Sequence, residues 1–165
     1  MIMIVSVLYS SSKPPTDSMC LDVGRAIANA GHDLLVMPGD GMPKITRAYK
    51  DAGGLKVVML FPDADDFGTE HVDKYRHLAD DLVVGMSWAE ANCEITKRSD
   101  IVVVTGMGPG ALIELGFIKY NFSFFKKPQK LVLLKGIELP SILEECYKEI
   151  GLPVDRVASA SELFL

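Results

Sequence analysis

The chain has 165 residues, of which 48% are hydrophobic, and its net charge at pH 7 is -5. This length predicts a single domain over residues 1–165, and the apolar content is too high for an intrinsically disordered chain. The acidic balance argues against a nucleic-acid-binding protein, because such affinity rests on Lys and Arg meeting phosphates.

The N-terminal segment is predicted to be a buried strand rather than a signal peptide, because MIMIVSVLYSSS lacks a basic start and turns polar after nine residues. No apolar run reaches the ~18 residues of a membrane span. Cys20, Cys93 and Cys146 form no C-x-x-C pair, which favours a reducing compartment over a disulfide scaffold or a zinc site. We therefore expect a cytoplasmic protein with no metal site and no membrane contact.

In the first half of the chain, apolar runs alternate with helical patterns. Strands are predicted at 2–9, 33–37 and 55–61. A helix capped by Thr16 or Asp17 is predicted to end at Gly31, and a shorter helix is predicted within 44–54, where Gly-Gly stops it. The charged segment 62–80 is predicted to be mostly loop and exposed helix.

The second half continues the alternation. Strands are predicted at 82–86, 100–106 and 130–134, with a last edge strand in the tail 156–165. Helices are predicted at 87–99, 109–125 and 139–151, the first of them opened by a capping box of Ser87 and Glu90. Strands alternating with helices of this length predict a Rossmann-like, doubly wound α/β domain with a mainly parallel sheet covered by helices on both faces. Such sheets bind ligands at the carboxyl ends of their strands.

Three glycines punctuate the stretch IVVVTGMGPGALIELG, namely Gly106, Gly108 and Gly110. Pro109 suits the first helical position, where its missing N–H costs nothing. The free N–H groups of residues 110–112 would then point out of the helix end, where they can hold a phosphate. The stretch is neither a G-x-G-x-x-G fingerprint nor a Walker A loop. A tight turn, whose glycines only let the strand meet the helix, remains the alternative.

A second glycine turn, PGDGMP, contains Gly39, Asp40 and Gly41. Asp40 would repel a phosphate but can accept a hydrogen bond from a ribose hydroxyl. The alternative role for Asp40 is that of an N-cap or of a solvated turn residue. Ser10 and Ser11 follow the first strand. Their hydroxyl groups can bind a ribose or a base, or simply form a turn.

These motifs, in this order, resemble the LONELY GUY-like family of lysine-decarboxylase-type proteins, and within it the molybdenum-cofactor carrier-like branch. GMGPGALIE at 106–114 matches the family pattern G-G-G-x-G-T-x-x-E at its glycines and at Glu114. VLYSSS, PGDGMPKITRAYKDAGGLKVVMLFP, VVGMSWAEANCEITKRSDIVVV and KKPQKLVLL are similar to further family segments. The resemblance covers about residues 2 to 135.

The resemblance implies a Rossmann-like fold, a nucleotide site and a homodimer. In the phosphoribohydrolase branch, an Arg and the motif Glu act on the N-glycosidic bond of a nucleoside 5′-monophosphate, while the glycine loop and its Thr hold the phosphate. Here the family Thr is Ala111, and the family Arg falls at Ala91, just before Asn92. These departures remove a hydroxyl donor and a bidentate contact, which weakens the hydrolase assignment and leaves nucleotide binding in place.

The sequence thus predicts a carrier or sensor of a nucleotide or nucleotide-like cofactor, with the phosphate held by the Gly106–Leu112 loop. The alternative is a phosphoribohydrolase that uses Glu114, unless Glu114 is only an exposed helix glutamate. The predicted ligand-binding residues are Ser10, Ser11, Gly39, Asp40, Gly41, Asn92, Gly106, Met107, Gly108, Pro109, Gly110 and Ala111.

The expected ligand is a nucleoside monophosphate or a molybdopterin-like molecule, and no further cofactor is required. The predicted helix 109–125 is apolar around most of its circumference, more than one buried face needs. Together with the resemblance, it predicts a homodimer or a higher oligomer.

Overall fold

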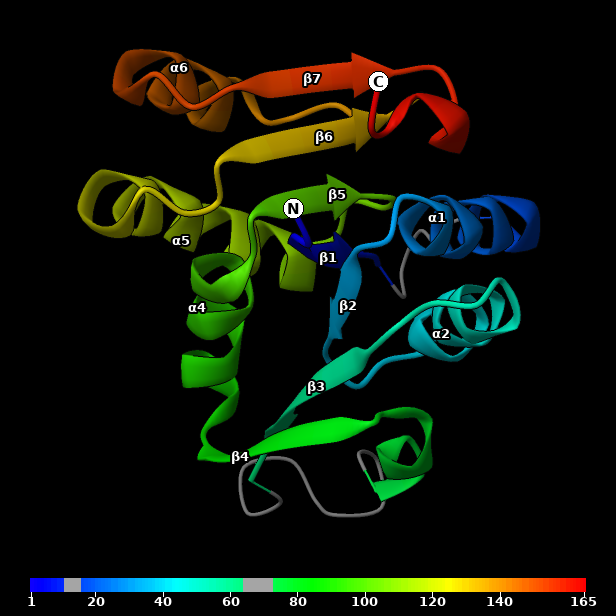
Figure 1. Ribbon diagram of the computed structural model, residues 1–165. Helices are drawn as coiled ribbons and strands as arrows, with labels where there is room; N and C mark the ends of the chain where they lie inside the picture. Colours follow the sequence, from blue (N-terminus) through cyan, green and yellow to red (C-terminus); the bar gives the residue numbers. More distant parts are fainter. Residues whose placement is uncertain (11–15, 64–72) are drawn as a thin grey trace.

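Seven parallel strands form one sheet in the computed structural model, which describes residues 1–10, 16–63 and 73–165 (Figure 1). The strand order across the sheet is β4-β3-β2-β1-β5-β6-β7. The strands are β1 (Ile4–Leu8), β2 (Asp33–Val36), β3 (Val57–Pro62), β4 (Asp81–Met86), β5 (Ile101–Val104), β6 (Lys130–Leu134) and β7 (Val154–Val157). Every neighbouring pair is parallel, so the predicted doubly wound α/β fold is confirmed.

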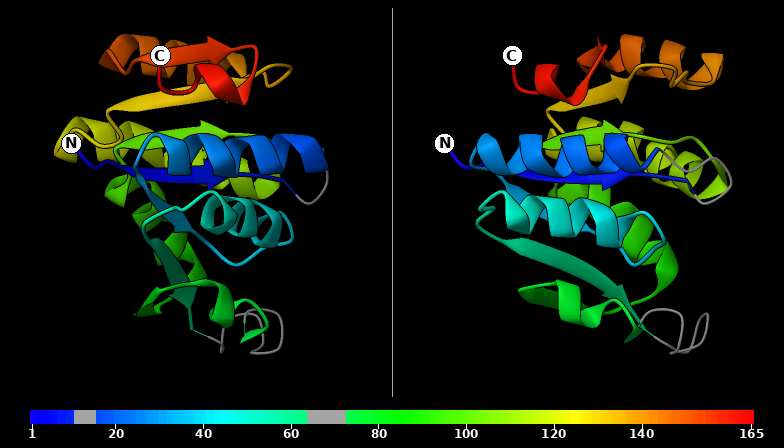
Figure 2. Two further views of the ribbon diagram at one scale, coloured as in Figure 1. Left: turned by 45° about the vertical axis from the view of Figure 1, so that its right-hand side comes forward. Right: turned by 90° about the vertical axis from the view of Figure 1, so that its right-hand side faces the viewer.

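Helices cover both faces of this sheet (Figures 1 and 2). One face carries α1 (Asp17–Asn29) and α2 (Met42–Asp51), and the other carries α4 (Trp88–Arg98), α5 (Pro109–Phe125) and α6 (Ser141–Ile150). Two short 3₁₀ turns, η2 (Arg76–Leu78) and η3 (Ala160–Glu162), complete the described elements. Each helix and strand lies within two or three residues of its predicted position.

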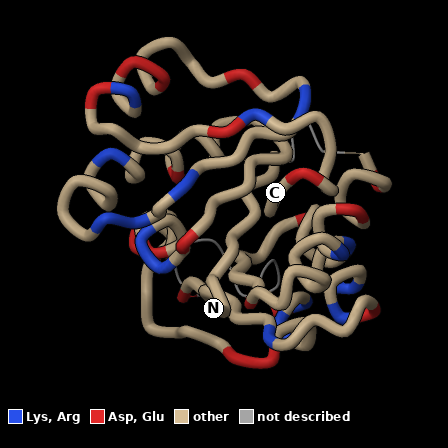
Figure 3. The backbone as a smooth tube through the Cα atoms, turned by 45° about the horizontal axis from the view of Figure 1, so that its top comes forward, with Lys and Arg blue, Asp and Glu red and all other residues tan. Residues whose placement is uncertain are grey.

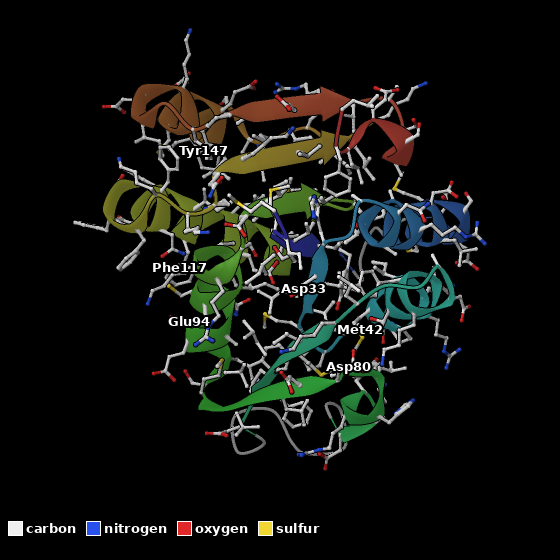
Figure 4. All side chains as sticks on the ribbon, in the orientation of Figure 1. Asp33, Met42, Asp80, Glu94, Phe117 and Tyr147 are labelled. Carbon is white, nitrogen blue, oxygen red and sulfur yellow. The ribbon has the colours of Figure 1, made fainter. Side chains whose placement is uncertain are left out.

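The core consists of two apolar layers, one on each side of the sheet. Along β5, Ile101 and Val103 pack toward α1 and α2, whereas Val102 and Val104 pack toward the other three helices. This alternation explains why β5 is apolar at every position, since both faces of the parallel sheet are covered there. On the second face, Tyr147 lies fully buried between α6 and the sheet (Figure 4), and its hydroxyl donates to the Leu115 carbonyl at 2.7 Å.

Local signals set the helix ends as predicted. The Thr16 hydroxyl accepts a hydrogen bond from the Met19 amide at 3.2 Å at the start of α1. Ser87 and Glu90 form the predicted capping box at the start of α4, with distances of 3.2 and 2.7 Å. Residues 64–72 of the charged segment 62–80 lie outside the described part. Pro62 ends β3, and the residues after 72 include the η2 turn and lead into β4.

The strand order reverses between β1 and β5. From β1 the chain moves outward through β2 and β3 to β4, and α4 then returns it to β5 beside β1. Thr105 joins the two carboxyl ends, because its amide and its hydroxyl both donate to the Leu8 carbonyl, at 2.9 and 3.0 Å. A crevice at this switch point is the usual ligand site of such folds.

Charged side chains of both signs are interspersed over the helices and loops, while the central strands carry few of them (Figure 3). Among the described residues, no helix combines the length and the apolar character that crossing a membrane requires.

Candidate functional site

A cavity of about 260 Å³ opens at the carboxyl ends of the central strands, beside the switch point. Four segments build it: the end of β1, the β2–α2 turn, one side of α4 and the start of α5. Its lining residues are Val7, Leu8, Tyr9, Ser10, Met37, Pro38, Gly39, Asp40, Trp88, Asn92, Ile95, Pro109, Gly110 and Glu114. Both predicted glycine turns therefore reach the same cavity.

The start of α5 presents two free backbone donors to this region. Gly108 is the N-cap and Pro109 follows it at the first helical position. The amide of Leu112 donates to the Gly108 carbonyl at 2.9 Å, so the prediction of three free amides was wrong at Leu112. The amides of Gly110 and Ala111 make no hydrogen bond to any described residue, and two donors at a helix N-terminus remain.

The rest of the glycine loop lies beside the cavity rather than in its wall. Pro109 and Gly110 line it, whereas Gly106, Met107 and Gly108 do not. Met107 packs against the apolar layer under α4 and α5. The side chain of Ala111 is buried in that same layer, only 1% exposed, so a contact from residue 111 to a ligand would use its amide.

The glycines of the β2–α2 turn are explained by the ring of Tyr9. A Cβ atom placed on Gly39 would lie 2.6 Å from the Tyr9 hydroxyl oxygen, and one on Gly41 would lie 3.1 Å from the ring. The Tyr9 hydroxyl donates to the Met37 carbonyl at 2.7 Å, which fixes the ring against the turn. Gly39 lines the cavity, but Gly41 does not. The close approach that these glycines permit is thus to an aromatic ring of the protein itself.

Asp40 is exposed at the rim of the cavity, and its carboxylate accepts a hydrogen bond from the Tyr75 hydroxyl at 2.9 Å. It is not an N-cap, since Gly41 holds that position at the start of α2. Ser10 is buried and lines the cavity, while Ser11 lies outside the described residues. Asn92 also lines it, and its side-chain amide donates to the Trp88 carbonyl at 2.8 Å.

The basic residues of α4 point away from the cavity. Lys97 Nζ and Arg98 Nε both donate to the carboxylate of Glu94 (labelled in Figure 4), at 2.9 and 2.7 Å. Ala91, at the family Arg position, is fully buried in the apolar layer. The described residues that line the cavity accordingly include two carboxyl groups and neither lysine nor arginine.

Glu114 is the buried acid of the site. Its side chain is 9% exposed, lines the cavity, and has no hydrogen bond or ion pair with any described residue. Burial raises its pKa from near 4.5 to about 8, because an ionised carboxylate is poorly solvated there. Burial, and then the charge of Glu114, raise the pKa of Tyr9 well above its usual value. Glu114 is therefore not the exposed helix glutamate that the sequence left as an alternative.

Several lining residues were not among the predicted site residues, notably Tyr9, Met37, Pro38, Trp88 and Ile95. Tyr9 and Met37 directly follow the ends of β1 and β2, with Pro38 one residue later, and this position was the available signal. Trp88 is half-buried and packs against both core layers as well as lining the cavity. Within the described ranges, no cluster of three His, Cys, Asp or Glu side chains is arranged to hold a metal ion.

Comparison with solved structures shows the same fold throughout. A molybdenum cofactor binding protein from Rippkaea orientalis is 22% identical, with a TM-score of 0.69 over 97% of this chain and 91% of that chain. The molybdenum cofactor carrier protein from Chlamydomonas reinhardtii is 19% identical, with a TM-score of 0.67 over 99% and 94%. TM1055, a structural-genomics target, is 20% identical, with a TM-score of 0.70 over 98% and 95%.

No curated protein matches the sequence. The model of the SLOG cluster4 family, in contrast, matches residues 2–163, which is nearly the whole chain. This match and the carrier-type structures confirm the resemblance drawn from the ordered motifs. The chain belongs to the SLOG cluster4 family.

Proposed function

We propose that the protein binds a small phosphorylated ligand, either a nucleoside monophosphate or a molybdopterin-like cofactor, and acts as its carrier or sensor. The observation that carries this proposal is the cavity at the β1–β5 switch point, into which the start of α5 and the buried Glu114 both project. No further cofactor is needed for this function. The solved carrier and binding proteins for the molybdenum cofactor share the fold and support this class of ligand.

The phosphate would sit at the start of α5. The amides of Gly110 and Ala111 make no hydrogen bond to a described residue, and the helix dipole adds ~0.3–2 kcal/mol for an anion. Gly110 lines the cavity, and a Cβ atom at this position would have no heavy atom within 4 Å, so the approach to its backbone is open. The rest of the ligand would extend toward Asn92, Asp40 and Trp88 along the cavity wall.

Binding without turnover is favoured by the missing catalytic partners. Ala91 and Ala111 replace the Arg and Thr of the phosphoribohydrolase pattern, and both side chains are buried. No lysine or arginine among the described residues lines the cavity, so no cationic side chain from these residues can clamp a phosphate there.

Glu114 supports the second candidate, a nucleoside 5′-monophosphate phosphoribohydrolase. A carboxyl group with a pKa of about 8 can give a proton to a leaving base near neutral pH. In that reaction the bond between the base and C1′ breaks, water adds at C1′, and the products are the free base and ribose 5-phosphate. Removing such an acid lowers turnover by roughly 10²–10⁴-fold.

The two functions are separated by a thermal-shift panel of AMP, GMP, CMP and IMP, followed by measurement of free base with the wild-type protein and Glu114→Gln. We expect a nucleotide to raise Tm and no base to be released. Release by the wild type that the variant abolishes would establish the hydrolase. If none of the four nucleotides raises Tm, the nucleotide form of the proposal fails, and the molybdenum cofactor becomes the ligand to test.

A homodimer is also proposed, supported by the exposed apolar face of α5. Ile113, Tyr120 and Phe124 are 53%, 59% and 76% exposed there, at spacings that place them along one side of the helix. A cytoplasmic location is proposed from the three free cysteines, of which Cys20 is buried and Cys93 and Cys146 are half-buried.

A further inference from the structure

Two of the side chains that line the cavity with Glu114 direct a hydrogen-bond donor to a backbone carbonyl. The Tyr9 hydroxyl donates to the Met37 carbonyl, and the Asn92 side-chain amide donates to the Trp88 carbonyl. Asp40 can only accept while ionised, and it already accepts from Tyr75. Tyr9 and Asp40 can therefore offer a ligand only acceptor atoms, while Asn92 keeps one N–H group.

Glu114 differs from Asp40 in what surrounds it. Asp40 is exposed and hydrogen-bonded, so water and Tyr75 stabilise its charge. Glu114 is 9% exposed, and it makes no hydrogen bond or ion pair with any described residue. A buried carboxylate without such partners is costly, and the group keeps its proton instead. The raised pKa of about 8 agrees with this geometry.

We propose that Glu114 enters the complex as an uncharged carboxylic acid and donates a hydrogen bond to the ligand, so that the cavity selects a ligand with a neutral acceptor atom at this point. The inference rests on the proposed function, because it assumes that the ligand occupies this cavity. Suitable acceptors are a sugar ring oxygen, a carbonyl oxygen or an unprotonated ring nitrogen. An amino group, in contrast, would be selected by an ionised carboxylate.

A neutral acid also suits a phosphate at the start of the same helix. Glu114 follows Gly110 by one helical turn, so an ionised carboxylate would repel the phosphate across a water-poor space. The protonated form removes that repulsion and supplies a hydroxyl donor, which neither Tyr9 nor Asp40 provides.

The first test measures the protonation of Glu114 directly, without a ligand. Protein labelled with ¹³C at the glutamate δ-carbon is titrated by NMR, and the Glu114 resonance is assigned by its absence in Glu114→Gln. We expect it to stay in the protonated position through about pH 7 and to titrate near pH 8. Titration below about pH 6 would overturn the inference, whatever binds to the protein.

The second test measures the affinity for AMP by calorimetry at about pH 7 and about pH 9.5, where the phosphate stays fully ionised. From the lower to the higher pH, the affinity of the wild type should fall about 10- to 30-fold, because only protein with protonated Glu114 binds. Glu114→Gln keeps a donor that does not titrate and should bind equally at both pH values. Glu114→Leu, which has no donor, should bind weakly at both.

Neighbouring groups are controlled in the same experiment. Tyr9 and Asp40 line the cavity with Glu114, Tyr75 lies behind Asp40, and the residues that α4 contributes to the wall do not titrate in this range. Asp40→Asn should retain the pH dependence of the wild type. Equal wild-type affinity at both pH values would overturn the donor role. If AMP binds to no variant, the nucleotide form of the proposed function fails, and the NMR titration alone decides the protonation of Glu114.

Discussion

Glu114 makes the stability of this protein depend on pH in an unusual direction for an acid. Most carboxyl groups have a lower pKa in the folded state, and the folded protein gains stability as pH rises. For Glu114 the pKa rises from near 4.5 to about 8 on folding, so the folded state binds the extra proton between these values. Stability due to this group is therefore complete below about pH 4.5 and is lost as pH rises through 8.

Glu114→Gln should remove this loss. At about pH 8.5 we expect the variant to exceed the wild type in free energy of unfolding by a few kcal/mol, with an upper limit of about 5 kcal/mol from ~1.4 kcal/mol per pKa unit. At about pH 5 the two proteins should agree within ~1 kcal/mol. Urea unfolding at both pH values measures this difference, with Glu149→Gln at an exposed position of α6 as the control. A constant difference at both pH values would contradict the linkage.

The two glycines of the cavity wall should respond oppositely to alanine. In Gly39→Ala the new Cβ meets the Tyr9 hydroxyl oxygen at 2.6 Å, so we expect a loss of about 1–3 kcal/mol in stability. In Gly110→Ala the Cβ enters open space on a helix, where alanine is favoured by up to ~1 kcal/mol. Thermal unfolding measures both. Gly110→Ala should fold well and yet bind nucleotide more weakly; unchanged affinity would mean that the phosphate lies elsewhere.

At the scale of elements, α4 and α5 bring the polar groups of the site together. Helix α4 contributes Trp88, Asn92 and Ile95 from its first two turns, and α5 contributes Pro109, Gly110 and Glu114. The two helices are held to each other by Asn121 of α5, which donates to the Cys93 carbonyl at 3.0 Å and to the Thr96 hydroxyl at 2.8 Å. This contact therefore helps to fix the two helices that form this side of the cavity wall.

The start of α4 should be sensitive to its cap. Ser87→Ala removes the acceptor for the Glu90 amide and breaks the capping box, so we expect a loss of about 0.5–2 kcal/mol. Because Trp88 and Asn92 lie in the turns that follow, ligand affinity should fall as well. Chemical denaturation and calorimetry measure the two effects. Ser141→Ala is the control, since Ser141 begins α6 without a side-chain cap and should change neither quantity.

The exposed face of α5 should control assembly. Phe124→Glu places a charge on the proposed interface and should halve the mass measured by light scattering at micromolar concentration. Ile142→Glu is the matched control, because Ile142 is also highly exposed, at 74%, but belongs to α6 and not to α5, and it should leave the mass unchanged. A wild-type protein that is already monomeric would refute the dimer.

The elements were predictable because their signals are local. The Thr16 cap, the Ser87–Glu90 capping box and the continuous apolar strands each lie within a few residues of sequence, and the structure confirms them. The ordered glycine motifs also led to the family and to the end of the sheet at which the cavity opens. The site itself was predicted only in part. Tyr9 and Gly39 meet across about thirty residues of chain, and no sequence spacing reveals that contact.

At the scale of the molecule, the electrostatics of the site are unusual for a phosphate binder. The net charge is -5, and the described cavity lining holds two carboxyl groups and neither lysine nor arginine. The proposed anionic ligand would thus be held by backbone dipoles and hydrogen bonds against a mildly repulsive background.

The affinity for AMP should therefore depend weakly on salt. Between about 50 and about 300 mM NaCl we expect a change of less than ~3-fold, or a small gain as salt screens the repulsion. Calorimetry at both salt concentrations checks this, and Asp40→Asn should reduce any gain. A steep loss of affinity with salt would show that a cationic side chain reaches the phosphate in the complex.

Trp88 is the only tryptophan in the chain, and its indole lines the cavity while resting on both layers of the core. The intrinsic tryptophan fluorescence of the protein therefore comes from a single residue in the wall of the candidate site. A base or pterin ring that stacks on the indole would quench this light, whereas a ligand bound elsewhere would leave it unchanged. The protein thus carries an optical reporter that can follow occupancy in real time without any label.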